Sequence, residues 1–431
     1  MDFATFLLVN AALFIRPGEI SPALAGVPIY QGLILLCLAV SAPKLVAQWT
    51  ARPLSARPAT VCMLGLLASA VMSHLSRLNV GQALAAGADF GRITLYYLLF
   101  VAVVDTPSRL RGMLLGLLAF IAVMTALALC QYHGLVDIPT LKVLERNEED
   151  PATGEILVIL QLVGTGIFND PNDFSLALSL GCLISLYLAG ERRYGLLRGL
   201  WLGFLGLFGY AITLTQSRGG VLALGAGLLS LLASRVGLRR AAVAGALAFS
   251  LALPLLGGRL AKMSTSSDTA QERIHLWRDA LEQFRRAPLF GIGVNTLADE
   301  IGLVAHNSYV HSFAEMGLMG GTCFVGLFLI CAAILLADGR PGEMDADPDL
   351  RRARPYLLAI LSMFAVGLFS LTRCYVASTY VPAALAESYQ NLVCPSPWPR
   401  VAMGSRLAAI LIGVSLACVV GLFTFVRVFL Q

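Results

Sequence analysis

Long apolar stretches recur along the whole chain and are separated by short polar segments. Twelve of them approach the roughly 20 residues that a helix needs to cross the hydrocarbon core of a bilayer. They lie at about 3–15, 24–42, 58–75, 83–104, 109–131, 171–189, 199–216, 219–234, 241–256, 308–336, 354–373 and 403–430. The pattern predicts an all-α, polytopic integral membrane protein with about 12 transmembrane helices.

The composition agrees with this pattern. Of the 431 residues, 57% are hydrophobic and 13% are charged, whereas a soluble domain carries roughly 25% charged residues. This excludes a secreted disulfide scaffold, a disordered chain and a nucleic-acid-binding domain, so no nucleic-acid partner is expected. There is no fixed-period repeat and no large cytoplasmic segment, and a single transmembrane domain over 1–431 is predicted.

The positions of Lys and Arg predict the orientation of the helices. With a cytoplasmic N-terminus, the inner loops and tail hold 16 basic residues against 9 elsewhere, apart from the long loop 257–306. Both termini are therefore expected in the cytoplasm. Long outer loops are then predicted at 132–170 and 257–306, and the acidic run 145–150 is expected to be a solvated part of the first.

A third outer segment, 374–400, contains several prolines and is not expected to form one long regular helix. Cys374 and Cys394 lie in it, and a disulfide between them is a hypothesis. Metal chemistry has no support in the sequence, which contains no CxxC or HExxH motif and no zinc-type spacing of its five histidines. No cofactor is expected.

Arg218 lies in Thr215-Gln-Ser-Arg-Gly-Gly220, between two adjacent predicted spans. Gly219 and Gly220 are expected to let the backbone turn tightly there, which leaves Arg218 near the outer interface. A guanidinium at this place is shaped to bind phosphate oxygens bidentately. The alternative is a structural role, in which Arg218 snorkels or caps the preceding helix.

The long outer loop contains apolar residues at helical spacing, from Ile274 to Phe284. An amphipathic helix that can lie on the bilayer surface is predicted. Arg273 opens this helix and can bend toward a ligand at the membrane surface. Arg278 is a further cation of the helix, whose alternative role is contact with lipid headgroups.

The third cluster spans 306–320 and begins where this loop enters a span. Histidine has an ordinary pKa near 6.5, so His306 is well suited to act as a base. His311 and Glu315 are four residues apart and are expected to satisfy each other on one helix face, a structural role for both. Gly317, Gly320 and Gly321 are expected to allow close helix packing.

Two smaller elements complete the candidates. Asp170, Pro171 and Asp173 are typical of a helix N-terminus, which is a structural role, and a functional role is equally supported for Asp170 and Asn172. Asp89 and Arg92 lie three apart inside a predicted span and are expected to pair, while Arg92 is also a candidate site residue.

Together these motifs resemble those of the O-antigen ligase/polymerase superfamily of bacterial membrane glycosyltransferases. That family's pattern His-Asn/Ser-x-x-Leu-x-x-x-x-Glu-x-Gly matches from His306 to Gly317, with Val310 in the leucine position. The resemblance covers about 168–320, including the predicted periplasmic loop 257–306. The remaining matches are Arg218-x-x-x-Leu222, Arg273-x-x-x-Trp277, Pro288-Leu-Phe-Gly291-Ile-Gly293 and Asp170-Pro-Asn172.

The resemblance implies a helical membrane glycosyltransferase (GT-C-like) fold in the bacterial inner membrane, with the active site facing the periplasm. Such enzymes transfer a glycan from undecaprenyl diphosphate to an acceptor hydroxyl of a saccharide or lipid, without a metal, and membrane lipids surround them. It implies catalytic roles for His306, Arg218 and Arg273, substrate contacts for Arg218, Arg273, Asn307, Arg278 and Arg92, and supporting roles for Glu315, His311, Asp170 and Asn172.

Two alternatives remain at this point. One is a polysaccharide polymerase of the same superfamily, which differs only in the acceptor. The other is a non-enzymatic transporter or flippase of lipid-linked sugars. A transporter predicts charged residues near the membrane midplane and broken helices in both halves, whereas the charges here cluster on one face.

Overall fold

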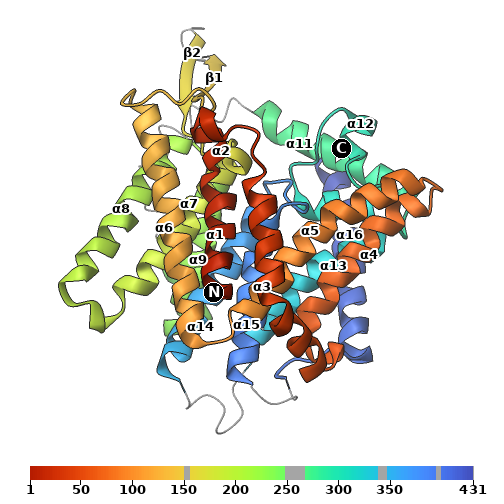
Figure 1. Ribbon diagram of the computed structural model, residues 1–431. Helices are drawn as coiled ribbons and strands as arrows, with labels where there is room; N and C mark the ends of the chain where they lie inside the picture. The colour runs from red at the N-terminus through yellow and green to blue at the C-terminus, as the bar shows by residue number, and fades with distance from the viewer. Residues whose placement is uncertain (150–155, 248–266, 338–346, 395–398, 431) are drawn as a thin grey trace. The chain divides into compact units, whose positions relative to one another are not determined.

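The computed structural model describes residues 1–149, 156–247, 267–337, 347–394 and 399–430 (Figure 1). The described chain is almost entirely helical and folds into two compact units, each assembled from three stretches of sequence. The helix α3 (Ile29–Ala51) belongs to the first unit up to Ala42 and to the second unit from Pro43 onward.

The first unit is built around α7, which is apolar on all sides. Of its apolar span, 89% is buried, as expected for a helix with no polar face. Around it pack α6, α8, α9 and α14. The elements of this unit are α1 (Asp2–Ile15), α2 (Pro17–Ile20), η1 (Pro22–Leu24), α6 (Pro107–Tyr132), β1 (Leu144–Glu149), β2 (Ile156–Gln161), η3 (Gly166–Phe168), α7 (Pro171–Ala189), η4 (Arg192–Leu197), α8 (Arg198–Thr215), α9 (Arg218–Val236) and α14 (Pro348–Gly367).

The second unit is built around α13, which packs against α4, α11, α15 and α16. Two small clusters of buried apolar residues lie where α11 meets α13 and α16. The elements of this unit are η2 (Leu54–Ala56), α4 (Pro58–Leu75), α5 (Val80–Val103), α11 (Ser267–Arg286), α12 (Leu297–Ile301), α13 (Ser308–Leu336), η5 (Ala377–Tyr380), α15 (Val381–Val393) and α16 (Ser405–Phe429).

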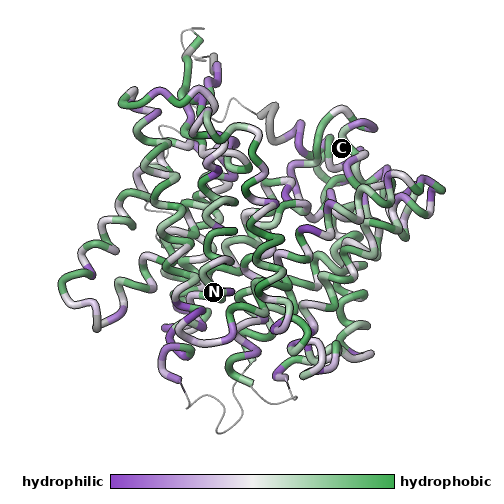
Figure 2. The backbone as a smooth tube through the Cα atoms, in the orientation of Figure 1, coloured by the Kyte–Doolittle hydropathy of each residue, from purple (hydrophilic) through white to green (hydrophobic). Residues whose placement is uncertain are grey.

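The predicted all-α membrane architecture is confirmed. Ten helices of the described residues are long and apolar enough to cross a membrane, and they coincide with ten of the twelve predicted segments. Of the other two, 354–373 corresponds to the charged helix α14, and 241–256 extends beyond the described residues. Figure 2 shows hydrophobic residues along the helices and hydrophilic residues gathered toward many of their ends.

The acidic run expected to be a solvated loop is instead a strand. β1 pairs with β2 in an antiparallel hairpin, with Glu145 opposite Leu160 and Asn147 opposite Val158. The partner strand is a run of β-branched and other apolar residues, which favours pairing over an open loop. Asp150, the last residue of the run, lies outside the described residues.

The hypothesis of a Cys374–Cys394 disulfide is wrong. Both residues are buried free thiols, and the 13-residue helix α15 lies between them in the sequence. Tyr375, next to Cys374, donates to Glu315, whereas Cys394 O accepts from Arg52, in the loop at the other end of the unit. The segment 374–400 is therefore not a simple outer loop, because α15 begins inside it at Val381.

The direction of α16 bears on the predicted topology. The backbone N–H of Met403, just before α16, donates to Ser55 O over 2.7 Å. Near the other end of α16, Phe425 lies against Trp277 of α11 with ring centroids 6.0 Å apart. The last turn of α16 therefore lies at the α11 end of the unit, away from the loop that contains Arg52 and Arg57. A periplasmic α11 and a cytoplasmic C-terminus do not fit together in this arrangement.

The arrangement of α16 gives a labelling prediction. In a Cys418→Ser background, an impermeant maleimide added to intact cells should label cysteines introduced at His275 and Val428 alike, because both lie at the α11 end. A cysteine at Arg406 should stay unlabelled until the cells are opened. Labelling of His275→Cys and Arg406→Cys, with Val428→Cys protected, would contradict this path for α16.

Candidate functional site

The residues that the sequence singled out fall into both units. Arg218, Asp170 and Asn172 belong to the first unit. The second unit holds the other candidates, His306, Asn307, His311, Glu315, Arg273, Arg278 and Arg92. Each group is described within its own unit.

In the first unit, Arg218 is the first residue of α9. The turn that precedes it is made at Gln216, whose φ of 55° is left-handed, and Ser217 caps α9 by accepting from Gly220 N. The expectation that Gly219 and Gly220 make the turn is therefore wrong, because both already lie inside the helix. Arg218 is exposed at the positive end of the helix dipole, where anions are favoured.

Gly220 serves a close approach of two helices instead. A Cβ atom at this position would lie 1.7 Å from Ser175 Oγ and 2.4 Å from Ser175 Cβ on α7. The glycine thus lets the start of α9 lie directly on α7.

The start of α7 joins the same cluster. Asp170 caps the helix by accepting from Asn172 N at 2.8 Å and Asp173 N at 3.4 Å, as the sequence predicted. The Ser217 hydroxyl donates to Asn172 Oδ1 over 2.6 Å. Asp170 and Asn172 are therefore fixed beside the residue that precedes Arg218.

Two neighbours of this cluster were not found from the sequence. The chain after β2 is tied to the end of α8, since Leu162 N donates to Leu214 O at 3.0 Å. Arg16 follows α1, pairs with Glu19 at 2.7 Å and packs on Gly166. An arginine at the end of an apolar run was the available signal for Arg16.

In the second unit, α13 is broken at Gly317. This residue has φ 65°, and a Cβ atom there would lie 2.4 Å from the backbone of Leu289. Gly317 therefore interrupts the helix, in contrast to the packing role expected for it, while Gly320 and Gly321 make room for the side chains of Met316 and Phe313.

A segment of the loop before α13, residues 288–297, pairs with the broken turn, and we call it the strap. Ile292 N donates to Ala314 O and Gly293 N to Glu315 O. In return, the N–H groups of Leu318 and Met319 donate to carbonyl groups at the start of the strap, Pro288 and Leu289. Four backbone groups of the broken turn thus find hydrogen-bond partners in the strap, as backbone groups in a membrane interior require.

Glu315 fastens the strap with its side chain. Its carboxylate accepts from Asn295 N at 2.8 Å, from Leu297 N at 2.9 Å and from the Tyr375 hydroxyl at 2.7 Å. His311 Nε2 lies 3.2 Å from the same group, so the predicted pair of His311 and Glu315 is present. Both side chains are buried, and these contacts hold the strap against α13.

Tyr375 was not found from the sequence, because no periodicity links it to Glu315. Loss of water around its hydroxyl raises the pKa of Tyr375 well above the ordinary value, and the charge of Glu315 raises it further. The hydroxyl therefore stays protonated and remains a donor. His74 of α4 is a second residue of this cluster that the sequence did not indicate. Its Nε2 donates to Val294 O of the strap at 3.0 Å.

His306 follows the strap and α12, directly before the N-cap of α13. Its φ of 47° is left-handed, which histidine adopts more often than most residues. The Asn307 side chain accepts from Tyr309 N at 3.0 Å and Val310 N at 3.2 Å. Asn307 is fully buried, so it fixes the helix start and thereby the place of His306.

The amphipathic helix α11 holds the same end of the unit. Trp277 Nε1 donates to Ala305 O over 2.9 Å, which joins the turn after Arg273 to the residue before His306. The rings of Phe284 and Phe313 lie 6.0 Å apart. The apolar face of α11 therefore packs on α13 and α16, and it is not free to rest on the bilayer surface as expected.

The other two predicted substrate contacts, Arg278 and Arg92, are each paired with a nearby carboxylate. Arg278 is engaged by its neighbour Asp279 at 2.9 Å. Arg92 pairs with Asp89 at 2.9 Å, as predicted, and its side chain is 67% exposed. Residue 92 lies about 200° around the helix from Phe90, which contacts Tyr375, so Arg92 faces away from the Glu315 cluster.

One further cation lies close to His306 in the fold. Ser308 Oγ donates to Leu371 O at 2.6 Å and accepts from Arg373 N at 2.9 Å. Arg373 is thereby held at the start of α13, although the sequence placed it at the end of a span. In the sequence, Arg373 could have been found as an arginine that ends an apolar run at the predicted outer surface.

The arrangement in the second unit suits acid–base chemistry beside anionic groups. A half-buried imidazole lies at a rigid helix start, with Arg273 one helical turn from the Trp277 anchor and Arg373 on the adjoining segment. Among the described residues, no three His, Cys, Asp or Glu side chains are grouped as in a metal site.

The sequence of this region matches a known family. A family model described as O-Antigen ligase matches residues 202–325, from α8 to the middle of α13. The matched range contains Arg218, Arg273, His306 and Glu315, whereas Asp170 and Arg92 lie outside it. No curated protein matches the chain significantly.

The contact between α7 and α9 gives a stability prediction. Gly220→Ala should lower the free energy of unfolding by about 1–3 kcal/mol, because rotation of Ser175 cannot relieve the clash with its Cβ atom. Gly225→Ala is the matched control in the same helix, since a Cβ atom there meets nothing within 4 Å. Unfolding in SDS measures both, and Ser175→Gly should rescue Gly220→Ala. Equal stability of the two alanine variants would contradict the contact.

The role of Glu315 gives a second prediction. In Glu315→Gln, an amide NH₂ would face the N–H and O–H donors that the carboxylate now accepts, so the variant should lose about 1–3 kcal/mol of stability. Glu282→Gln removes an exposed carboxylate paired with Arg285 and should cost less than about 1 kcal/mol. Thermal unfolding compares them, and an equally small effect of both would show that Glu315 does not hold the strap.

Proposed function

We propose that this chain, whose residues 202–325 match the O-antigen ligase family model, transfers a glycan from undecaprenyl diphosphate to an acceptor hydroxyl. The match supports an O-antigen ligase/polymerase-type membrane enzyme, and the donor, the acceptor and the mechanism are part of the proposal. We place the reaction at the periplasmic face of the bacterial inner membrane. The observation that carries the proposal is the fixed position of His306 between the strap and the N-cap Asn307.

In the proposed reaction, His306 takes the proton of the acceptor hydroxyl. The hydroxyl oxygen then forms a bond to the anomeric carbon of the donor sugar, and the bond from that carbon to the diphosphate oxygen breaks. The diphosphate leaves with the electron pair, and the anomeric configuration inverts. Undecaprenyl diphosphate and the elongated saccharide are the products.

Arg273 and Arg218 are proposed to neutralise the leaving diphosphate. For Arg273, the support is its place on α11, next to the turn that is bonded to the residue before His306. For Arg218, the support is its exposed position at the N-terminus of α9 and the presence of Ser217 and Asn172 beside it. Positive charge from arginine makes a metal ion unnecessary in this mechanism.

The remaining candidates are proposed to have different roles. Asn307, His311, Glu315, Asp170 and Asn172 are proposed to support the site, because each makes a hydrogen bond or ion pair to backbone or a side chain near it. Arg373 is added as a candidate contact for the anionic donor. Substrate contacts by Arg278 and Arg92 stay predictions from the sequence.

The test is glycan transfer by the purified full-length protein in nanodiscs, with an undecaprenyl-diphosphate oligosaccharide and a lipid A core acceptor. His306→Asn should reduce turnover by about 10²–10⁴ while donor binding stays near normal. Asparagine tolerates the left-handed backbone of residue 306, so the loss reports the base and not the fold. His275→Asn, an exposed histidine of α11, is the control.

Arg273→Ala should weaken donor binding, most at low salt, where charge attraction is least screened. Arg285→Ala, which removes an exposed arginine from the same helix, should not. Arg218→Lys keeps the charge and loses the planar fork, so it should be impaired if the contact is bidentate. Near-normal transfer by His306→Asn, with a folded but inactive His311→Ala, would show that the base is misassigned.

The same assay separates a ligase from a polymerase. Without the lipid acceptor, a polymerase yields lipid-linked chains of increasing length, whereas a ligase yields no new product. Movement of the donor across vesicles without any transfer product would instead support a transporter and overturn the proposed function.

A further inference from the structure

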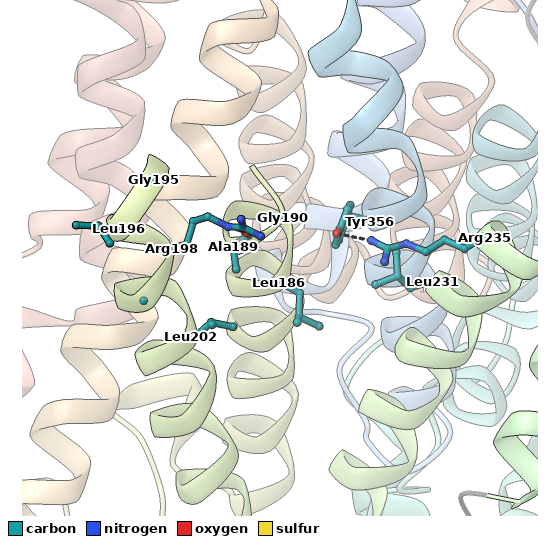
Figure 3. A pocket seen from close by; sticks show the side chains of 11 residues that line it. Leu186, Ala189, Gly190, Gly195, Leu196, Arg198, Leu202, Leu231, Arg235 and Tyr356 are labelled. Carbon is teal, nitrogen blue, oxygen red and sulfur yellow. Dashed lines mark hydrogen bonds between the residues drawn. The ribbon is translucent and has the colours of Figure 1, made fainter. Parts of the chain in front are cut away.

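A pocket of about 630 Å³ lies in the first unit, where α7 ends, α8 begins and α9 ends (Figure 3). Its lining includes two arginines, Arg198 of α8 and Arg235 of α9, and Tyr356 of α14. Figure 3 shows the two guanidinium groups pointing toward each other, with Gly190 and Tyr356 between them. The size is typical of small-molecule sites.

Each guanidinium has most of its donors left for a ligand. Arg198 Nε donates to Ala189 O at 2.7 Å, and Arg235 Nη2 donates to the Tyr356 hydroxyl at 2.8 Å. A guanidinium carries five N–H donors, so one contact orients each side chain and the rest stay available. The Arg235 group also lies 5.9 Å from the centre of the Tyr356 ring, which keeps it at the pocket wall.

The charge around the pocket is not balanced. Two neighbouring arginines, Arg111 and Arg352, share the carboxylate of Glu191 at 2.9 Å and 3.4 Å. By contrast, Arg198 and Arg235 have no carboxylate partner among the described residues, and no acidic residue lines the pocket. Two uncompensated guanidinium groups that face one space form an anion site.

Apolar side chains lie one helical turn deeper on each of the three helices. Leu202 follows Arg198 by four residues, Leu231 precedes Arg235 by four, and Leu186 precedes Gly190 by four. Four residues of helix correspond to about 6 Å. Charge therefore lies at the helix ends, and the wall becomes apolar toward their middle.

We propose that this pocket binds an anionic phospholipid, with the phosphate between Arg198 and Arg235 and the acyl chains along Leu186, Leu202 and Leu231. The order of charged and apolar residues with depth matches a lipid, whose headgroup lies at the membrane surface and whose chains lie below it. Basic pockets between transmembrane helices are a recurrent form of lipid recognition. In the predicted orientation this is the cytoplasmic leaflet, opposite the site of transfer.

The surface beside the pocket fits a lipid environment. Leu196, one of the lining residues, has 99% of its surface exposed, and Leu202 has 54%. Exposed leucines at the end of an apolar helix are costly in water and are satisfied by acyl chains. A soluble anion would leave this apolar wall unused.

The test titrates delipidated full-length protein with phosphatidylglycerol, phosphatidylcholine or inorganic phosphate, and native mass spectrometry measures binding. Phosphatidylglycerol should bind wild type most tightly. Arg198→Gln with Arg235→Gln should weaken it by at least about tenfold. Arg239→Gln with Arg240→Gln removes the same charge from exposed positions after α9 and should leave the affinity unchanged.

Equal loss in both double variants would overturn the proposal, since it would show only a general charge effect. Equal binding of phosphatidylglycerol and phosphatidylcholine would overturn anion selectivity, and full occupancy by inorganic phosphate would overturn the lipid. A second measurement uses wild type alone, so it does not depend on folding of a variant. Photoreactive phosphatidylglycerol should crosslink to residues 196–202, and crosslinks that avoid this stretch would contradict the site.

Discussion

The second unit depends on one constraint, which is that a broken transmembrane helix must find partners for the backbone groups it frees. Gly317 interrupts α13 where no water is expected, and an unpaired N–H or C=O there costs several kcal/mol. The strap supplies two donors and two acceptors to the broken turn. Glu315 then accepts two more N–H groups of the strap, so a single carboxylate fastens the loop to the helix that carries it.

This constraint explains how a loop residue becomes a precise site residue. The strap leads through α12 to His306, whose neighbour Asn307 starts α13. The chain on both sides of His306 is therefore anchored to one helix, by Glu315 on one side and by the cap on the other. α11 adds the Trp277 bond to Ala305. A general base gains most when its position is fixed before the substrate arrives, which is the proposed use of this rigidity.

Local patterns predicted the parts of the fold that depend on local sequence. The spans followed from apolar length, the cap of α7 from Asp170 and Pro171, and the contact of His311 with Glu315 from their spacing of four. Contacts across the fold had no such signal. Tyr375 and His74 meet the strap region through pairings that no period encodes, and the glycine at 317 looked like any packing glycine in an apolar helix.

Short elements were the other source of error. A 13-residue helix with a proline as its second residue looked like part of an outer loop, so α15 was missed, and the Cys374–Cys394 hypothesis failed with it. The acidic run looked like a loop because its apolar partner strand, Ile156–Gln161, lies further along the sequence. In each case the interaction that decides the structure joins residues that are far apart in the sequence.

The central claim is a single displacement, in which His306 activates the acceptor while arginine charge holds the departing diphosphate. The anomeric configuration of the new glycosidic bond tests it most directly. NMR of the transferred saccharide, made from a donor of known configuration, should show the inverted anomer in every product. A retained anomer would require a second displacement through another nucleophile, and it would contradict the mechanism.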